Sequence, residues 1–168
     1  MNKMNRKIEY GLMALKHMSH KRPGELTTAK EVADSYHAPF DATARVLQMM
    51  AHHGLLKVEH GALGGYVLTK DLNGVSLQDL IEIIQGPVKI AKCMHQNETC
   101  EIQSNCNIMG PVGALNIKLQ EFYRSLTLAE LLHQGSDKHG PDKHRPEKTG
   151  PEKVPQTEPL NGARGGRS

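Results

Sequence analysis

The hydrophobic pattern of the first forty residues predicts two helices. Apolar side chains recur at intervals of four and three residues, at Ile8, Leu12, Leu15 and Met18. This spacing places them on one face of a helix that we expect to run from about residue 5 to residue 18. An Arg-Pro-Gly break follows at residues 22–24, and Thr28 with Glu31 then forms a capping box that starts a second, short helix.

A third helix is expected to begin near Pro39, because proline lacks the amide hydrogen that a first helical turn leaves unpaired. Its apolar positions face inward at Val46, Leu47 and Met50, and Gly54 ends it. The second and third helices therefore form a helix-turn-helix pair. A recognition helix of this kind meets base edges in the major groove with the residues near its start. Here we expect these to be Asp41, Thr43 and Arg45, facing away from the core, with Pro39 and Phe40 beside them. Similar helix pairs occur in proteins that do not bind DNA, so the helix pair alone does not establish a DNA-binding domain.

After residue 54 the pattern changes to that of a β-hairpin. Residues 55–59 and 66–69 have the composition of two strands, and residues 61–65 form a glycine-rich turn between them. After a helix-turn-helix pair, such a hairpin is the wing of a winged helix; an ordinary hairpin is the alternative. Glycines let a backbone approach a phosphate or a minor groove without a side-chain clash. Besides the recognition helix, we expect the DNA-binding face to include Thr28, His60, Gly64, Gly65 and Tyr66.

Two more helices are expected after the hairpin. Ser76 and Asp79 cap a helix over residues 77–85, whose apolar face is Leu77, Leu80, Ile81 and Ile84 and which Gly86-Pro87 closes. Further along, apolar residues recur at intervals of four, three, four, three and four, at Ile108, Val112, Leu115, Leu119, Phe122 and Leu126. This is the spacing of a coiled-coil seam and predicts a long helix that pairs with a second copy of the chain. Packing against its own subunit is the alternative, because the run is short for a coiled coil.

Charge and composition divide the chain into three parts. Residues 1–70 hold ten Lys and Arg against six Asp and Glu, whereas residues 71–134 hold four against seven, so the first part is the better candidate for a nucleic-acid face. Residues 135–168 contain five prolines, six glycines and a repeated Pro-acid-Lys unit, which predicts a disordered tail that is either inert or a weak DNA tether. No secretory signal and no bilayer-length apolar run is present, which predicts a cytoplasmic protein without membrane contact.

The three cysteines of the chain, Cys93, Cys100 and Cys106, all lie within fourteen positions of mostly polar sequence. The gaps of six and five residues between them are wider than those usual in structural zinc sites, whereas an iron–sulfur cluster spans wider gaps. In a reducing compartment, a close set of thiols more often binds metal or senses redox state than forms a structural disulfide. Three unrelated thiols are the alternative.

These features occur in an order that resembles a known family. A helix, a helix-turn-helix, a Gly-x-x-Gly-Gly-Tyr-x-Leu wing at residues 61–68, a helix ending in Gly-Pro and three cysteines in a loop are similar to the Rrf2 superfamily, the iron–sulfur regulators of the IscR and NsrR kind. The resemblance covers residues 5 to about 134. It implies a homodimeric transcription regulator, a repressor of double-stranded operator DNA, that responds through a [2Fe–2S] or [4Fe–4S] cluster to redox state, nitric oxide or iron status.

The resemblance also implies that Cys93, Cys100 and Cys106 hold the cluster and that a fourth ligand completes the site. Some members place an acidic ligand from the opposite subunit at the start of the first helix, where this chain has Glu9. Others use a histidine three residues beyond the third cysteine, but this chain has Met109 there, which favours the oxygen ligand. His95 and His37 are further candidates, and a solvated surface glutamate is the alternative for Glu9.

Together these patterns predict a mainly α fold with a small β-hairpin wing. We expect a winged helix-turn-helix over residues 1–75, a cluster loop and long dimerisation helix over residues 76–134, and a tail over residues 135–168. The alternative function is an iron–sulfur or thiol-bearing protein-interaction module without specific DNA binding. The sequence contains no phosphate-binding glycine loop and no paired nucleophile and base, so it does not predict an enzyme.

Overall fold

The computed structural model describes residues 4–61, 64–94 and 100–133 of the 168-residue chain. The predictions for the tail, for His95 and for the tip of the wing at residues 62–63 lie outside these ranges. The helices and strands are α1 (Arg6–Ser19), α2 (Ala29–Tyr36), α3 (Phe40–His52), β1 (Leu56–Glu59), β2 (Gly65–Leu68), α4 (Leu77–Gln85), α5 (Met109–Ser125) and α6 (Leu128–His133). Short 3-10 turns lie at Leu72–Gly74, Lys92–Met94 and Gln103–Asn105. The predicted mainly helical fold with a two-stranded hairpin is confirmed.

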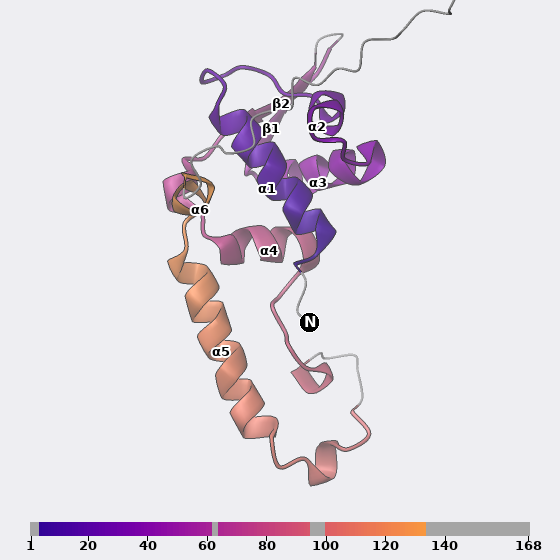
Figure 1. Ribbon diagram of the computed structural model, residues 1–168, viewed down its shortest axis with the longest axis vertical. Coiled ribbons are helices and arrows are strands. Elements are labelled where there is room, and N and C mark those ends of the chain that lie inside the picture. Colours follow the sequence, from indigo (N-terminus) through magenta and orange to yellow (C-terminus); the bar gives the residue numbers. More distant parts are fainter. Residues whose placement is uncertain (1–3, 62–63, 95–99, 134–168) are drawn as a thin grey trace, which may run out of the picture.

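The core forms where α1, α3 and α4 meet (Figure 1). The predicted stripe of α1 is buried at Ile8, Leu15 and Met18, and Leu12 packs at the edge of the core. A β-carbon on Gly11 would lie 2.8 Å from Cδ1 of Ile84, so a glycine at this position lets α1 approach α4 closely. The other predicted face, on α4, is buried at Leu77, Leu80, Ile81 and Ile84.

The helix-turn-helix is formed by α2 and α3. The Thr28 side chain accepts a hydrogen bond from the amide of Glu31, and the Glu31 side chain accepts one from the amide of Thr28, so the predicted capping box is confirmed. His37 ends α2 in the left-handed region at a φ of 52°, and Pro39 precedes α3. Three inward residues of α3, Val46, Leu47 and Met50, are fully buried, as predicted.

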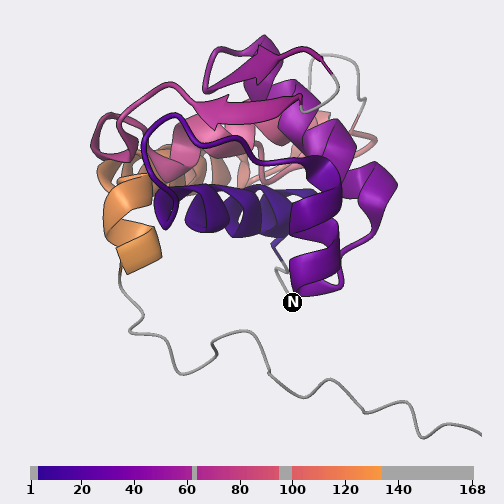
Figure 2. The same cartoon turned by 90° about the horizontal axis from the view of Figure 1, so that it is seen from above.

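The hairpin pairs β1 and β2 antiparallel, with Leu56 opposite Leu68 and Glu59 opposite Gly65. Figure 2 shows its two strands lying across one side of α1, with α6 near the C-terminal end of α1. A second pairing attaches the hairpin to the segment before α2, because Thr27 and Tyr66 form an antiparallel bridge. The hairpin is therefore held against the helix-turn-helix and occupies the place of a wing.

The last short helix, α6, is not among the helices expected from the sequence. The chain leaves α5 at Ser125, one residue before the predicted end of the seam, and returns to α4, where the amide of Leu77 donates to Leu126 O at 2.8 Å. The amide of Glu130 donates to Oγ1 of Thr127 at 3.1 Å at the start of α6. A Thr-x-x-Glu sequence is a capping signal, so Thr127 and Glu130 could have revealed this helix.

Figure 1 shows α5 as an arm that extends away from the body formed by α1 to α4, with the linker after α4 running beside it. None of the seventeen residues of α5 is buried. In the predicted seam, Val112 and Leu119 are half-buried, whereas one row of side chains at seven-residue spacing is exposed: Ile108 by 55%, Leu115 by 50% and Phe122 by 56%. This apolar row has no cover from the part of the subunit that the structure describes.

No helix within residues 4–61, 64–94 and 100–133 has both the length and the apolar character needed to cross a bilayer.

Candidate nucleic-acid interface and cysteine segment

The exposed surface at the start of α3 contains most of the residues predicted to contact bases. Pro39, Phe40, Asp41 and Arg45 are all exposed. Phe40 is 54% exposed, a large apolar surface for a residue in the first turn of a helix. In a major groove, an aromatic side chain can contact a thymine methyl group and an arginine can bind guanine. The surface thus has suitable chemistry, and the individual base contacts remain predictions.

Thr43 does not belong to this surface, and the prediction that it faces away from the core is wrong. Its side chain is 1% exposed, and its hydroxyl donates to the carbonyl oxygen of Pro39 at 2.9 Å. Threonine commonly bonds the carbonyl four residues earlier in a helix, which turns the side chain toward the helix axis. Thr43 also lies three residues before the buried Val46, so the helical repeat places it on the inward face.

The glycines of the wing have a packing role that the sequence alone does not reveal. A β-carbon on Gly64 would lie 2.6 Å from the carbonyl oxygen of Glu59, and one on Gly65 would lie 2.9 Å from that of Thr27. Both distances are shorter than β-carbons tolerate, so these positions need glycine for the hairpin to close and to contact Thr27. Their predicted contact with DNA is untested, and the close backbone packing is an independent reason for both residues.

Tyr66 also serves to hold the wing in place. Its side chain packs against the core, and partial burial raises the pKa of its phenol. Its backbone accepts from Thr27 N at 2.9 Å and donates to Thr27 O at 2.8 Å. The DNA contact of Tyr66 stays a prediction. Its half-buried side chain would have to make that contact with its exposed part.

The outer surface of the wing carries one exposed ion pair. Nζ of Lys57 lies 2.7 Å from Oε1 of Glu59, and each partner shifts the other: the hydrogen bond and charge raise the pKa of Lys57 and lower the pKa of Glu59. His60 follows in an exposed position. Lys57 and His60 therefore offer a positive charge and a hydrogen-bond donor beside the tip of the wing.

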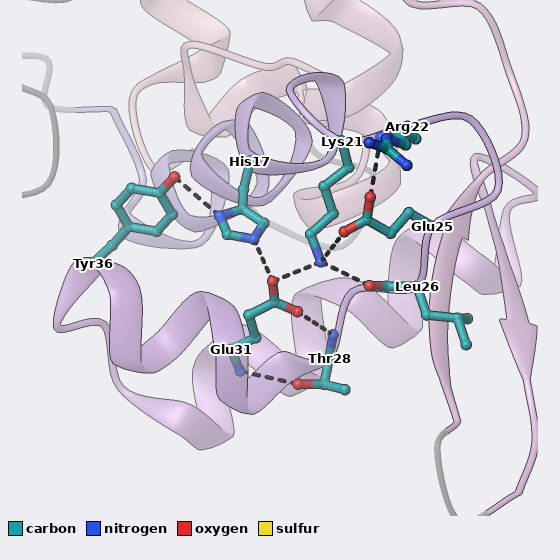
Figure 3. Close-up of polar contacts among 8 residues, drawn as sticks. All are labelled: His17, Lys21, Arg22, Glu25, Leu26, Thr28, Glu31 and Tyr36. Carbon is teal, nitrogen blue, oxygen red and sulfur yellow. Dashed lines mark hydrogen bonds and ion pairs between the residues drawn. The ribbon is translucent and has the colours of Figure 1, made fainter.

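A polar cluster lies between α1 and α2, and no pattern in the sequence predicts it. It is made by His17 of α1, Lys21 just after α1, and Glu31 and Tyr36 of α2 (Figure 3). Nε2 of His17 lies 2.9 Å and Nζ of Lys21 lies 2.6 Å from the same oxygen, Oε1 of Glu31. Nδ1 of His17 lies 3.2 Å from the Tyr36 hydroxyl. We call these four residues the Glu31 cluster.

Charge within the Glu31 cluster is stabilised by its surroundings. Burial raises the pKa of the Glu31 carboxyl, but hydrogen bonds from Lys21, His17 and Thr28 outweigh burial, so its pKa is lowered from the ordinary value of 4.5. The side chains of His17 and Lys21 are only 16% and 15% exposed. The carboxylate is therefore ionised and shared between two donors from the α1 side.

The three cysteines all lie in the linker between α4 and α5. Cys93 sits in the 3-10 turn Lys92–Met94, and Cys100 and Cys106 flank the turn Gln103–Asn105. All three thiols are free and half-buried. Among the residues that the structure describes, no three His, Cys, Asp or Glu side chains lie close enough together to hold one metal ion. In the described part of the linker, the predicted thiols therefore share one segment without being gathered into a formed site.

Two side chains of α5 fix the start of this linker. Oδ1 of Asn116 accepts from the amide of Ile90 at 3.2 Å, and Nε2 of Gln120 donates to the carbonyl of Val88 at 2.9 Å. Because Cys93 lies only three residues after Ile90, its position depends on α5. This role of Asn116 and Gln120 is not predicted from the sequence.

Glu9, the predicted fourth ligand, lies in the first turn of α1. Its carboxylate is 2.8 Å from an Arg6 guanidinium nitrogen, and its side chain is 30% exposed. The start of α1 lies close to the end of α4, where Asn5 Nδ2 donates to Gln85 Oε1 at 3.2 Å, so Glu9 is on the helix end nearest the beginning of the cysteine linker. Two positions considered for a histidine ligand are exposed: His37, at the end of α2, and Met109, at the start of α5.

Comparison with known proteins agrees with this arrangement. The model of a family described as "Rrf2: Iron-dependent Transcriptional regulator" matches residues 4–134. The HTH-type transcriptional regulator NsrR of Bacillus subtilis (strain 168) is 21% identical over 136 residues, covering 80% of this chain and 93% of that protein. The HTH-type transcriptional regulator CymR of the same organism is 25% identical over 96 residues, covering 57% of this chain and 70% of that protein.

Two solved structures share the fold. The structure of CymR, the global cysteine regulator of B. subtilis, aligns with a TM-score of 0.63 at 23% identity and covers 81% of this chain and 100% of that chain. IscR of T. potens aligns with a TM-score of 0.57 at 20% identity and covers 78% of this chain and 86% of that chain. The predicted winged-helix architecture is confirmed by these similarities.

Proposed function

The chain belongs to the Rrf2 family of iron-dependent transcriptional regulators, and from that membership we propose that it is a homodimeric repressor whose operator affinity depends on an iron–sulfur cluster. DNA-binding transcriptional regulation follows from the family itself and from relatives that are HTH-type regulators.

The observation that carries the proposal is the state and place of the three thiols. Cys93, Cys100 and Cys106 are all free and half-buried in one linker. Thiolates are the ligands that iron–sulfur clusters use, so the donor set fits such a group in its chemistry. When bound, a cluster would supply a redox-active centre that can be gained, lost or oxidised. Since the described thiols are not gathered, the linker has to close for all three to bind one group.

Glu9 is proposed as the fourth ligand, contributed across the dimer. A carboxylate is a harder ligand than thiolate and a poorer match to thiolate-bound iron, which makes the site labile. In the described structure the carboxylate is paired with Arg6, and that exposed pair is a weak competitor because exposed ion pairs contribute little. Glu9 can therefore leave Arg6 at small cost.

The dimer is proposed to form along α5. The exposed row of Ile108, Leu115 and Phe122 repeats every seven residues, which is the spacing with which one face of a helix meets a partner helix. Exposed apolar surface of this extent marks interaction sites in proteins. A second copy of this chain is the proposed partner, because the row continues the seam predicted from the sequence.

The path from the linker to DNA runs through α1 and α5. Asn116 and Gln120 tie the start of the linker to α5, and Glu9 lies at the start of α1. The core joins α1 to α3, so a change in the placement of α1 is passed to the recognition helix. Two recognition helices must lie about 34 Å apart to enter successive major grooves, so a small rotation between subunits releases one of them.

A second function fits the same three free cysteines, which form no group of three potential ligands within the described ranges. In that case the free cysteines act as a thiol sensor, or as part of a protein-interaction module, without a cluster. The two functions predict purified proteins of different colour and different iron and sulfide content. A cluster protein purified without oxygen is brown and contains matched amounts of iron and acid-labile sulfide; a thiol protein is colourless and contains neither.

The same preparation tests DNA binding. Counterion release predicts that affinity for duplex DNA falls steeply as salt rises, whereas an interaction module shows no such dependence. Brown protein with salt-dependent, sequence-selective DNA binding supports the proposal. Colourless protein that binds DNA with the same selectivity would assign the chain to the thiol sensors.

A further inference from the structure

We propose that Glu31 is a positioning residue for DNA binding, whose shared carboxylate holds both the helix-turn-helix and the wing in the orientation that DNA requires. Glu31 itself does not face DNA: it acts through the elements that it joins. The inference rests on DNA binding by the chain and does not depend on a cluster.

Glu31 joins α2 to the α1 side through Oε1 and caps the first turn of α2 through Oε2. Oε1 lies 2.9 Å from Nε2 of His17 and 2.6 Å from Nζ of Lys21, while Oε2 accepts from the amide of Thr28 at 3.4 Å. Figure 3 shows His17 and Lys21 pointing from the α1 side toward the same carboxylate. One side chain therefore closes the first turn of α2 and fixes that turn against α1.

Lys21 extends the connection to the wing. Its ammonium group also donates to the carbonyl of Leu26 at 2.7 Å and lies 3.9 Å from Oε1 of Glu25. Leu26 precedes Thr27, whose backbone pairs with Tyr66 of β2 by two hydrogen bonds. A continuous series of short contacts thus runs from the Glu31 carboxylate to the second strand of the wing.

The arrangement needs a carboxylate at this position. Gln is compatible with a capping box, so the helix cap does not by itself require Glu. A glutamine has one acceptor oxygen, whereas Glu31 uses two oxygens for three donors. A neutral amide also removes the nearer carboxylate from Lys21, whose side chain is 15% exposed, and leaves only Glu25 at 3.9 Å as a charge partner.

Loss of the carboxylate is expected to reduce DNA affinity by changing the conformations of the protein before it binds DNA. If α2 and the wing move relative to α1, only a fraction of molecules has both elements placed for DNA, and the apparent dissociation constant rises by the inverse of that fraction. A residue that only stabilises the fold lowers the melting temperature and leaves the dissociation constant unchanged at temperatures where the protein is fully folded.

The test compares Glu31→Gln and Lys21→Met with the unchanged full-length protein and with Glu130→Gln as the control. Glu130 is an exposed glutamate on α6, so this control removes the same charge outside the cluster. The probe is a labelled duplex selected by the unchanged protein from a random-sequence pool, with a random duplex alongside. Binding is measured at equal iron content and at a temperature where circular dichroism shows every variant folded.

We expect Glu31→Gln to weaken binding of the selected duplex about tenfold, the value for loss of one charge-assisted hydrogen bond. Lys21→Met should give a similar loss, and the double variant should lose less than the product of the two, because both changes break one connection. Since a displaced wing loses phosphate contacts, the slope of affinity against salt should also fall. Glu130→Gln should bind as the unchanged protein does.

An unchanged dissociation constant and salt slope in Glu31→Gln, with only a lower melting temperature, would overturn the proposal. If Glu31→Gln does not fold, the dissociation constant and salt slope of Lys21→Met provide the test instead, because this substitution leaves the capping box of Thr28 and Glu31 intact. These results are separate from the function proposed above. If the unchanged protein shows no difference between cluster-loaded and cluster-free states, that function fails while the effect of Glu31→Gln stands.

Discussion

Thr27 and Tyr66 exchange two backbone hydrogen bonds, with N to O distances of 2.9 and 2.8 Å, and this pair attaches the wing to the residue just before the capping box of α2. The two elements expected to meet DNA therefore share one backbone junction. A change at this junction moves the wing relative to the recognition helix without altering either element.

Gly65→Ala tests this junction. The added methyl group would lie 2.9 Å from the carbonyl oxygen of Thr27, a backbone atom that cannot move aside cheaply. We expect the free energy of unfolding to fall by about 1–3 kcal/mol, as for other forced overpacking, and DNA affinity to fall with it. Urea unfolding and duplex titration measure the two effects. Gly74→Ala is the control, since nothing lies within 4 Å of its β-carbon position; equal behaviour of the two variants would contradict the account.

Arg45→Ala tests the recognition surface of α3. Arg45 is exposed on the helix that the winged-helix arrangement places toward DNA. If it reads a base, its loss weakens specific binding by about 1–3 kcal/mol and relaxes selectivity at one position of the site. Binding to a panel of single-substituted duplexes measures this. An equal loss for every duplex would make Arg45 a phosphate contact, and Arg124→Ala on α5 controls for the removal of one positive charge.

Leu115→Glu tests the proposed dimer surface. Leu115 is 50% exposed at the middle of the row formed with Ile108 and Phe122. Burying a carboxylate in an apolar helix contact is costly, so we expect the dimer to dissociate at least about tenfold more readily. Sedimentation velocity measures the change. Ala114→Glu places the same charge on a neighbouring exposed position of α5, outside the seam, and should remain dimeric; a dimeric Leu115→Glu protein would place the interface elsewhere.

The lowered pKa of Glu31 gives a pH dependence of stability with a definite sign. Because the pKa in the folded protein lies below the ordinary value of 4.5, the contribution of Glu31 to stability is fully present above that value. It is lost as the pH falls through the lowered pKa. We expect the melting temperature of the unchanged protein to fall more between about pH 5 and pH 3 than that of Glu31→Gln, which has no carboxyl there. If the melting temperatures of both proteins fall by the same amount over this pH range, Glu31 gains no stabilisation from its partners.

Replacing any one of Cys93, Cys100 and Cys106 with Ala tests the ligand set. If all three hold one cluster, each variant purified without oxygen should lose most of its visible absorption and iron, and its operator affinity should match that of cluster-free protein. Ser104→Ala, in the same linker, is the control and should keep its colour. Unchanged iron and sulfide in all three cysteine variants would remove these residues from the site.

Much of the fold follows from local signals in the sequence. The capping pairs Thr28 with Glu31 and Ser76 with Asp79 start α2 and α4 where expected, because a side chain and an amide three residues apart satisfy each other without help from the rest of the chain. The buried stripes of α1 and α4 were predictable for the same reason, since the helical repeat alone decides which residues share a face.

Other features depend on neighbours that are distant in the sequence. The double role of Glu31 requires His17 and Lys21 to come from the α1 side, and the need for glycine at position 65 comes from the backbone of Thr27. The inward direction of Thr43 is reinforced by the hydrogen bond from its hydroxyl to the carbonyl of Pro39, a contact that the position of Thr43 near the start of α3 does not reveal. The closure proposed for the cysteine linker would depend on a bound group and a second subunit, which neither helical periodicity nor cysteine spacing describes.

The central claim is that operator affinity depends on the cluster, and one titration tests it directly. Protein purified without oxygen is divided in two, and the iron is removed from one half with a chelator under the same conditions. Both halves are titrated into one labelled, selected duplex at fixed salt, with iron and sulfide measured in each. The account predicts matched iron and sulfide in the first half and a dissociation constant that differs between the halves by about tenfold or more, a coupling typical of regulatory sites. Equal dissociation constants, or an iron-free starting protein with the same DNA affinity, would contradict it.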